Sequence, residues 1–483
     1  MTMTGRSRRA LRIGGSFAAL LLAGSALAAP APEQVPLPPQ QNQTLAHDIF
    51  RDIVEVRSVH DVGTKGVADI LVKYLKAGGF TDDEVKVVPE ANFPQQVNVV
   101  VRIKGNGKSH EKPVMWICHM DVVDAKADDW TLPPFQFTEK DGYYYGRGTS
   151  DMKDEDAAAA ASLIRLKQEG FVPDRDIIVA FTADEEVGQD QDGPAYLLKN
   201  ARPLVDAGLV IDPDGGSGEI ENGKRLDFTV ETSQKTYVTY TMTVTNKGGH
   251  SSEPRPDNAI YELAHALVRL SKYQFPFKTN ATTRLYFKAM AARQSGQTRA
   301  DMLALAASPK VNAKAAARLA TDPAMNAILH STCVATMLQA GVQENALPSR
   351  AVATVQCRIM PDETVEGTKA ALQKVVADPA ITMAELGFLT RGPASPPDPK
   401  LLSAVTKVAD SMWPGVPVVP VMAAGASDAL FTRGAGIPSY GVGGGWNDIH
   451  DIRMHGRNER MKVSTFYETV EFTYRLMKQL GGQ

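Results

Sequence analysis

Residues 177–186 read IIVAFTADEE, in which six residues typical of a buried strand are followed at once by polar and acidic ones. Similar short apolar runs, with turn residues between them, occur at 98–103, 114–118 and 209–211. Segments with helical spacing or composition lie between these runs, among them the alanine-rich stretch 156–168. Strands that alternate with helices in this way predict an α/β fold with a largely buried sheet.

Acidic and histidine side chains come at the ends of these predicted strands. His119 follows one strand, Glu185 and Glu186 follow a second, and Asp212 ends a third. In an open α/β sheet the carboxyl ends of the strands form the edge where ligands bind. We therefore expect these four side chains to lie in one site.

Five positions along the chain carry side chains suited to divalent metal ions. They are His119 in CHMDVV, Asp151 in GRGTSDMKDE, Glu186 in TADEEVG, Asp212 in VIDPDGG and His455 in MHGRNER. Two imidazoles and three carboxylates suit a pair of borderline-hard divalent ions, and the set would accept zinc, cobalt or manganese. A carboxylate has two oxygens, so one acid can bridge the two ions. The set predicts metal-assisted hydrolysis.

Each position has a simpler interpretation when it is considered alone. Asp151 precedes a predicted helix and could cap it. Asp214 lies two residues after Asp212 and competes for the same ligand role, and His450 competes with His455. The metal site is favoured because all five positions occur together and in this order.

Two further acids lie beside the expected ligands. Asp121 shares one side of an extended segment with His119, and a metal-bound histidine commonly donates its other ring N–H to a carboxylate. Glu185 precedes Glu186, and because adjacent side chains diverge, it can face the attacking water while Glu186 binds metal. A general base of this kind needs a pKa raised toward neutrality. We expect Asp121 to orient the histidine and Glu185 to act as the base.

Length and composition narrow the class of protein. The 483 residues are too many for one hydrophobic core, so two domains are expected. The content of 43% hydrophobic and 22% charged residues is that of an ordinary globular protein. The formal net charge of −3 gives no basic excess, so a nucleic-acid partner is not expected.

The N-terminus has the features of an export signal. Residues 6–12 contain four arginines, residues 17–22 are apolar, and Ala26-Leu27-Ala28 resembles a cleavage site. We expect a signal peptide at 1–28 and a periplasmic or secreted protein. An uncleaved membrane anchor is the alternative, but the apolar run is too short to span a bilayer. The arginines fit a twin-arginine signal, and the general secretory route is also consistent.

The pattern of polar and apolar residues changes near Gln234, which predicts the start of an inserted domain. Residues 236–245 alternate between polar and apolar side chains, and they form the first strand of a strand-helix-strand-strand-helix order. An additional helical segment, rich in Ala, Lys and Arg, lies at about 273–330. The boundaries that we expect are a Pro/Gln-rich linker at 29–43, a catalytic domain in two parts at 44–234 and 391–483, and a lid at 235–390.

The chain has three cysteines, Cys118, Cys333 and Cys357, each in an apolar or strand-like stretch. Buried free thiols are the simplest interpretation. In an oxidising compartment Cys333 and Cys357 could pair, and the sequence leaves both states open. Cys118 is expected to be part of the core of its strand and not a metal ligand.

Together these motifs resemble those of the co-catalytic zinc peptidases, which include carboxypeptidase G, aminoacylase, acetylornithine deacetylase and succinyl-diaminopimelate desuccinylase. The matching elements are His119-x-Asp121, the Gly-Arg-Gly before Asp151, Glu185-Glu186, Asp212, Gly249-His250-Ser251-Ser252 and His455. The stretch GGHSSEPRPDNAI, the helical insertion before Asn345 and the MHGRNER motif look most like Gly-Xaa carboxypeptidases and secreted N-fatty-acyl amino acid hydrolases. The resemblance covers essentially the whole chain after the signal.

The resemblance implies a fold and a metal-ligand set. The fold would be a discontinuous zinc-peptidase α/β domain of the phosphorylase/hydrolase-like type, with an inserted two-layer α+β lid. One zinc ion would be bound by His119, Asp151 and Asp212. The other would be bound by Asp151, Glu186 and His455.

The resemblance also implies roles for residues outside the ligand set. Glu185 would pass a proton from water to the leaving nitrogen, and His250 of the lid would polarise the scissile carbonyl, in its own or a neighbouring subunit's site. The residues implied for binding the substrate's carboxylate are Asn345, Arg358, Gly425 and Ser427. A planar guanidinium suits such a bidentate contact.

The expected activity is hydrolysis of the amide bond next to a free C-terminal carboxylate, which releases an amino acid from dipeptides or short peptides. An N-acyl amino acid amidohydrolase of the aminoacylase type is the alternative among enzymes. A periplasmic binding protein for amino acids or peptides is the alternative from another class, although Glu185, Glu186 and two metals argue against it. The resemblance also implies a homodimer formed through the lid, and no stable membrane anchor is expected after signal cleavage.

Overall fold

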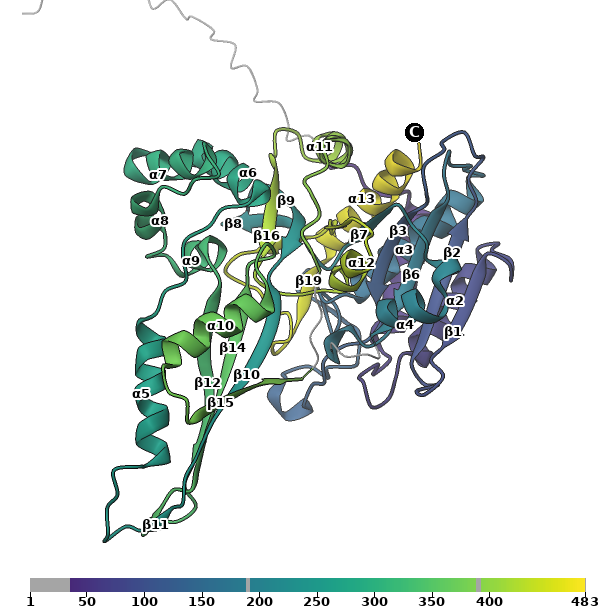
Figure 1. Cartoon of the computed structure of the whole chain (residues 1–483). Helices are drawn as coiled ribbons and strands as arrows, with labels where there is room; N and C mark the ends of the chain where they lie inside the picture. Colours follow the sequence, from purple (N-terminus) through teal and green to yellow (C-terminus); the bar gives the residue numbers. More distant parts are fainter. Residues whose placement is uncertain (1–34, 188–191, 388–391, 483) are drawn as a thin grey trace, which may run out of the picture. The chain divides into compact units, whose positions relative to one another are not determined.

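The computed structural model describes residues 35–187, 192–387 and 392–482 (Figure 1). The predicted signal peptide, residues 1–28, lies outside these ranges. The first helix, α1 (Gln40–Val54), begins four residues before the expected start at Thr44, so the last part of the predicted linker is helical. Pro39 precedes this helix, and its fixed φ is compatible with a helix start. In the described part of the chain, no helix is long and apolar enough to cross a membrane.

The larger sheet is formed by strands from both parts of the catalytic domain. Its order in the described residues is β1-β2-β6-β3-β7-β17-β9-β8-β18, and β16 pairs with β9. The strand bounds are β1 Val85–Pro89, β2 Val97–Ile103, β3 Val114–His119, β6 Ile177–Thr182, β7 Leu209–Asp212, β8 Gly218–Glu221, β9 Lys224–Gln234, β16 Val418–Ala423, β17 Ser439–Gly441 and β18 Trp446–Asp448. Neighbouring strands β6, β3, β7 and β17 are parallel, so their carboxyl ends meet at one edge.

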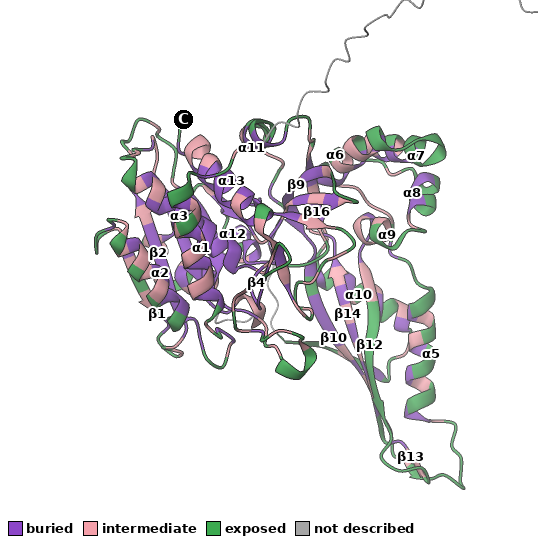
Figure 2. Ribbon diagram, turned by 180° about the vertical axis from the view of Figure 1, so that it is seen from behind, coloured by how far each residue is buried: buried purple, intermediate pink, exposed green. Residues whose placement is uncertain are grey.

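Helices cover both faces of this sheet. The views in Figures 1 and 2 show α1, α2 (Lys65–Ala77) and α3 (Lys153–Gln168) on one face, and α4 (Gly193–Asn200) with α12 (Ala429–Gly434) on the other. The remaining helices of this part are α11 (Pro399–Met412) and α13 (Val463–Gly481), which pack against each other, and α13 also packs on α3. Short 3-10 turns occur at η1 (Ala127–Asp129), η2 (Glu185–Val187) and η3 (Arg202–Leu204).

Helix α3 is buried on nearly every side. Residues 157–161 are five consecutive alanines, all buried, which suits a helix enclosed by the sheet, α1 and α13. At its start the buried Lys153 donates hydrogen bonds from Nζ to the carbonyl oxygens of Ile53 (2.9 Å) and Val56 (2.7 Å). These carbonyls lie at the C-terminal end of α1, where a cation is favourable, so α1 and α3 are tied at the end next to Asp151.

The lid contains a second, four-stranded sheet in the order β12-β14-β10-β15. Its strands are β10 Thr236–Thr245, β12 Thr332–Ala340, β14 Arg350–Ile359 and β15 Ile381–Leu386, and the helices α5 (Ala259–Lys272) and α10 (Val365–Val376) contribute to its apolar core. Strand β15 adds to the expected order of elements. Its sequence, ITMAEL, is mostly exposed and lacks a clear alternation, so the pattern did not reveal it.

The expected helical insertion forms a separate small core. Its helices are α6 Ala281–Met290, α7 Gly296–Ala306, α8 Ala313–Leu319 and α9 Pro323–Leu329, with the turn η4 Ala291–Arg293. Two short ribbons complete the description: β11 (Gly249–His250) pairs with β13 (Ala346–Leu347), and β4 (Thr138–Lys140), β5 (Tyr143–Tyr145) and β19 (Arg460–Lys462) pair in the order β19-β5-β4.

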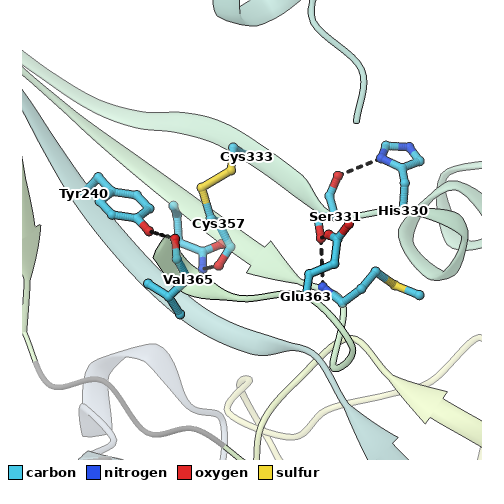
Figure 3. Close-up of a disulfide and its surroundings, with 9 residues drawn as sticks. Tyr240, His330, Ser331, Cys333, Cys357, Glu363 and Val365 are labelled. Atoms are coloured by element: carbon cyan, nitrogen blue, oxygen red, sulfur yellow. Dashed lines mark hydrogen bonds between the residues drawn. A yellow bond between two sulfur atoms is a disulfide. The ribbon is translucent and has the colours of Figure 1, made fainter. Parts of the chain in front are cut away.

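A disulfide joins β12, an edge strand of the lid sheet, to its neighbour β14. Cys333 of β12 and Cys357 of β14 are directly opposite each other in the ladder, with Cα atoms 4.1 Å apart, and their sulfurs are bonded (Figure 3). The interpretation as buried free thiols therefore holds only for Cys118. The pairing depends on strand register, which the sequence alone does not fix.

Candidate metal centre

His119, the last residue of β3, is oriented by the backbone carbonyl of Asp121, two residues further along the chain. The ring is only 1% exposed, and its Nδ1–H donates to the carbonyl of Asp121 at 3.1 Å. With the proton on Nδ1, the lone pair is on Nε2, which is buried and lies 3.3 Å from Oδ1 of Asp151 without the geometry of a hydrogen bond. A buried acceptor nitrogen of this kind is what a histidine metal ligand requires, so His119 fits the predicted role.

The carboxylate of Asp151 lies between two imidazoles. Its Oδ1 is 3.3 Å from Nε2 of His119, and its Oδ2 is 3.0 Å from Nε2 of His455. Burial raises the pKa of Asp151, but the two imidazoles outweigh that effect, and the net pKa lies below the usual range. One oxygen toward each ring is the arrangement that a carboxylate bridging two ions needs.

His455 is in contact with a second carboxylate. Its Nε2 lies 3.0 Å from Glu186, and hydrogen bonds to Asp151 and Glu186 raise the pKa of the imidazole to about 10. The site therefore favours positive charge at this point. Ligand atoms of His119, Asp151 and Glu186 all lie within 4.8 Å of one another, a spacing that suits shared metal ions.

Asp121 has a different contact from the one expected. Its carboxylate oxygens accept the backbone N–H groups of Glu185 (3.2 Å) and Glu186 (3.1 Å), and the nearer oxygen is 3.7 Å from Nδ1 of His119. The backbone carbonyl of Asp121 therefore orients the imidazole, and its side chain fixes the turn that carries the two glutamates. Burial raises the pKa of Asp121 to about 6.

Glu185 is surrounded by other acids. Burial raises the pKa of its carboxyl well above the usual range, and the nearby carboxylates of Asp214 and Asp428 add to the shift. A carboxyl that resists ionisation can hold a proton near neutral pH, which fits the expected general base.

The structure separates the two acids of the VIDPDGG stretch. The Oδ2 of Asp212 accepts hydrogen bonds from the hydroxyl of Ser427 (2.6 Å) and the N–H of Ala429 (2.9 Å), and its Oδ1 accepts the N–H of Asp214 (3.3 Å). Asp212 thus anchors the start of α12. Asp214 accepts no hydrogen bond from the described residues, and burial together with the carboxylate of Asp151 raises its pKa. The carboxylate of Asp212 is thus occupied by structural hydrogen bonds, whereas that of Asp214 accepts none in the described residues.

His450, the alternative to His455 as a metal ligand, lies beside Glu221. His450 is exposed, and its Nε2 is 3.4 Å from the carboxylate of Glu221 on β8. Its backbone N–H donates to Asp448 in a local turn. His450 is thus a surface residue.

The predicted carboxylate-binding residues fall into two groups. Arg358 of β14 reaches the loop that contains Gly425: its Nη1 donates to the carbonyl of Ala424 at 3.1 Å, and the guanidinium lies over the Tyr237 ring. Gly425 is exposed beside it. Ser427 is buried, and its hydroxyl is engaged by Asp212 and Gln234, so it is not free to bind a substrate.

His250 and Asn345 form the second group: His250 is in β11, which lies at the far end of the lid (Figure 1), and Asn345 precedes β13, the strand that pairs with β11. The N–H of Ser251 donates to the carbonyl of Asn345 at 3.1 Å, and Nδ1 of His250 contacts the hydroxyl of Ser252 at 2.7 Å. Strand β10 starts beside the catalytic sheet and has ten residues, so its far end, next to β11, is about 30 Å away. In the described residues no hydrogen bond or ion pair joins His250 to the metal-site side chains.

Gln96 and His60, which the sequence analysis did not single out, contact Asp184, the residue that precedes Glu185 and Glu186. The carboxylate of Asp184 accepts hydrogen bonds from Nε2 of Gln96 (2.7 Å) and contacts Nδ1 of His60 (3.0 Å). Asp184 is in the quoted TADEEVG stretch, and its φ of 61° is uncommon for a residue other than glycine. The stretch gave no sign that residues 60 and 96 would be its partners.

Comparisons with known proteins agree with this geometry. The model of peptidase family M20/M25/M40 matches residues 115–479. An N-fatty-acyl-amino acid synthase/hydrolase of Xenopus tropicalis is 28% identical over 381 residues, which covers 78% of this chain and 74% of that protein.

Solved structures share the fold. A metallo-carboxypeptidase of the M20 family from Sulfolobus solfataricus aligns with a TM-score of 0.67 and 19% identity, over 90% of this chain and 99% of that one. A dinuclear metal-binding M20 peptidase of Bacillus subtilis aligns with a TM-score of 0.58 and 12% identity, over 92% and 98% of the two chains. The α/β fold with an inserted lid is thus confirmed.

Proposed function

The chain belongs to peptidase family M20/M25/M40, and on that premise we propose that it is an exported hydrolase that cleaves N-acyl amino acids at a dinuclear metal centre. Membership makes it an enzyme of the metallopeptidase and amidohydrolase type, so the binding-protein alternative is set aside. The observation that carries the proposal is the Asp151 carboxylate between Nε2 of His119 and Nε2 of His455, beside Glu185.

N-acyl amino acids are preferred here over the dipeptides that the sequence first favoured. The relative from Xenopus tropicalis is named for N-fatty-acyl-amino acids. In the lid, Tyr237, Val334 and Met337 are exposed apolar side chains on the face of the sheet that carries Arg358. An arginine that binds the carboxylate and an apolar surface next to it would suit an acyl group better than a charged peptide terminus.

Two divalent ions, zinc in the first place, would be held in two positions. His119, Asp151 and Asp214 would form one, and Asp151, Glu186 and His455 the other. Bound metal would supply Lewis-acid polarisation of the carbonyl and activation of water. Glu185 would take up the proton released by the attacking water and deliver it to the leaving nitrogen. Arg358 and the backbone near Gly425 would bind the substrate's carboxylate.

The assignment of Asp214 in place of Asp212 can be tested by two matched substitutions. We expect Asp214→Asn to weaken binding of one metal ion by 10-fold or more, because a direct ligand is lost, with little change in thermal stability. Asp212→Asn is expected to lower thermal stability instead, because a buried carboxylate that accepts hydrogen bonds from Ser427 and Ala429 is neutralised. Metal titration and thermal unfolding of both variants check this. The opposite pattern would restore Asp212 as the ligand.

The proposed reaction is tested on purified protein with a matched panel that contains N-acyl amino acids of increasing chain length, Gly-Xaa dipeptides and longer peptides. Each substrate is used with and without a chelator, and zinc is then restored. We expect chelator-sensitive release of the free amino acid, with the highest kcat/KM on an N-acyl substrate. A preference for dipeptides would return the assignment to a carboxypeptidase. Absence of any metal-dependent amide hydrolysis would reject the proposed function.

Export is supported by one further observation. The Cys333–Cys357 disulfide is characteristic of proteins that fold in an oxidising compartment such as the periplasm. Together with the N-terminal pattern it supports a periplasmic or secreted enzyme.

The location of His250 and Asn345 supports a homodimer. Both residues lie at the far end of the lid, and their hydrogen bonds in the described part of the chain stay within that end, so a second subunit could present them to the metal centre. Strand β12 offers a surface for pairing, because it is an edge strand with exposed apolar side chains that include Leu338, 63% exposed.

A further inference from the structure

Two loops that carry metal-site residues run side by side. Strand β5 leads through Gly146 to Asp151, and the loop from His455 leads into β19. The two strands are antiparallel, with Arg460 opposite Tyr145, so the loops leave the ribbon at the same end. The N–H of Gly146 donates to the carbonyl of Glu459 at 3.2 Å. The ribbon thus brings Asp151 and His455 together although they lie far apart in the sequence.

The Glu459 side chain is the main link between these loops. Its Oε1 accepts the N–H of Gly148 (3.1 Å), the N–H of Ser150 (2.9 Å) and the hydroxyl of Ser150 (3.2 Å). Its Oε2 accepts a hydrogen bond from Nη1 of Arg147, and Nη2 of that arginine donates to the carbonyl of Gly456 at 3.3 Å. One carboxylate therefore accepts hydrogen bonds from three residues of the loop before Asp151, which are Arg147, Gly148 and Ser150, while its backbone belongs to the His455 loop.

This link is fully removed from solvent. Glu459 is 0% exposed and Arg147 is 3% exposed, and the guanidinium also lies over the Trp130 ring, 5.3 Å from its centroid. Burial of two charges is costly and is not an efficient way to gain stability, since an apolar pair of similar volume often does as well. Only a carboxylate, however, can accept the backbone N–H groups next to Asp151 and pair with the arginine at the same time.

We propose that Glu459 is a positioning residue that sets the distance between Asp151 and His455 and thereby controls one of the two metal positions, an inference that rests on the proposed dinuclear centre. The position that His455 shares with Asp151 and Glu186 depends on the linked loops. The other position also includes Asp151, but its remaining ligands, His119 and Asp214, come from the ends of β3 and β7 and share no hydrogen bond with the His455 loop in the described residues. Loosening the link should therefore affect the two positions unequally.

Glu459→Gln tests this proposal, because glutamine keeps the shape and one acceptor but presents an N–H group to Arg147. Metal-free wild type and variant are titrated with Co²⁺, followed by its visible absorption, and with Zn²⁺ by competition with a chelator. We expect two ions to bind to the wild type. In the variant the first ion should bind as in the wild type, and the second should bind about 10- to 100-fold more weakly.

Glu468→Gln is the matched control. Glu468 is also a buried acid that pairs with an arginine: it accepts hydrogen bonds from Arg225 (2.6 Å) and from Nε1 of Trp413 (2.7 Å), in contacts that include no proposed ligand. This control should bind both ions as the wild type does. Arg147→Lys is a second variant that keeps the charge and should weaken the second ion to a smaller degree, so the proposal remains testable if Glu459→Gln does not fold.

The outcomes are distinct. If the Glu459 variant binds both ions like the Glu468 control, or loses both equally, the proposal is wrong while the dinuclear centre stands. If the wild type itself binds fewer than two ions, the proposed function and this inference both fail.

Discussion

Replacing Glu185 by glutamine is expected to lower kcat about a thousandfold while two metal ions stay bound. Burial and neighbouring acids raise the pKa of the Glu185 carboxyl, so this side chain is suited to hold and release a proton, and glutamine cannot do so. The ligands named above are unchanged in this variant. Steady-state hydrolysis of an N-acyl amino acid, together with the metal content of the same sample, checks both parts of the expectation.

Glu90→Gln serves as the control for this substitution. Glu90 is another buried acid of the catalytic domain; its carboxylate accepts a hydrogen bond from Asn98, and burial raises its pKa to about 7. Its replacement should leave kcat unchanged within a factor of about two. An active Glu185 variant would show that another group is the base, and loss of metal from it would show that Glu185 is a ligand.

Replacing His250 by alanine is expected to lower kcat by about 100-fold or more without loss of metal, because a donor to the developing oxyanion is removed. The proposed dimer makes a sharper experiment possible. In a mixed dimer of His250→Ala and Glu185→Gln chains, the site with intact Glu185 would receive the intact His250 of the other chain. Random exchange of subunits should then restore about a quarter of the wild-type activity.

The mixing experiment separates the two arrangements of the lid. If His250 acted in its own chain, each kind of site in the mixture would lack one residue, and no activity would return. His265→Ala is the matched control, because His265 is also an exposed histidine of the lid, on α5. This variant should keep wild-type kcat alone and should not change the result of mixing.

Much of the catalytic domain could be predicted because its central strands are buried on both faces. Runs such as Ile177–Thr182 and Val114–His119 are apolar up to their last residue and bounded by turns, so their limits were close to those observed. Strand β15 was missed for the opposite reason, since it lies at the edge of a half-exposed sheet and its residues meet few constraints.

For the candidate site, the sequence indicated which residues could bind metal, but it did not reveal which residues form hydrogen bonds with them. His119, Asp151, Glu186 and His455 come together as expected. The choice between Asp212 and Asp214 could not be made, because it depends on Ser427, which is 215 residues further along the chain. The same limit applies to Ser427 itself, whose hydroxyl the fold uses for structure, and to His250 and Asn345, which lie at the end of a long lid strand.

The link between Arg147 and Glu459 joins residues that are 312 positions apart, and this separation bears on how the enzyme is made. During synthesis, the first four proposed ligands and the entire lid leave the ribosome before His455 does. A nascent chain that stops before this residue would contain most of the fold but only part of the metal centre. If the proposed ligand set is correct, an incomplete chain would lack a ligand of one metal position, and we expect full activity only after the segment with His455 has been made.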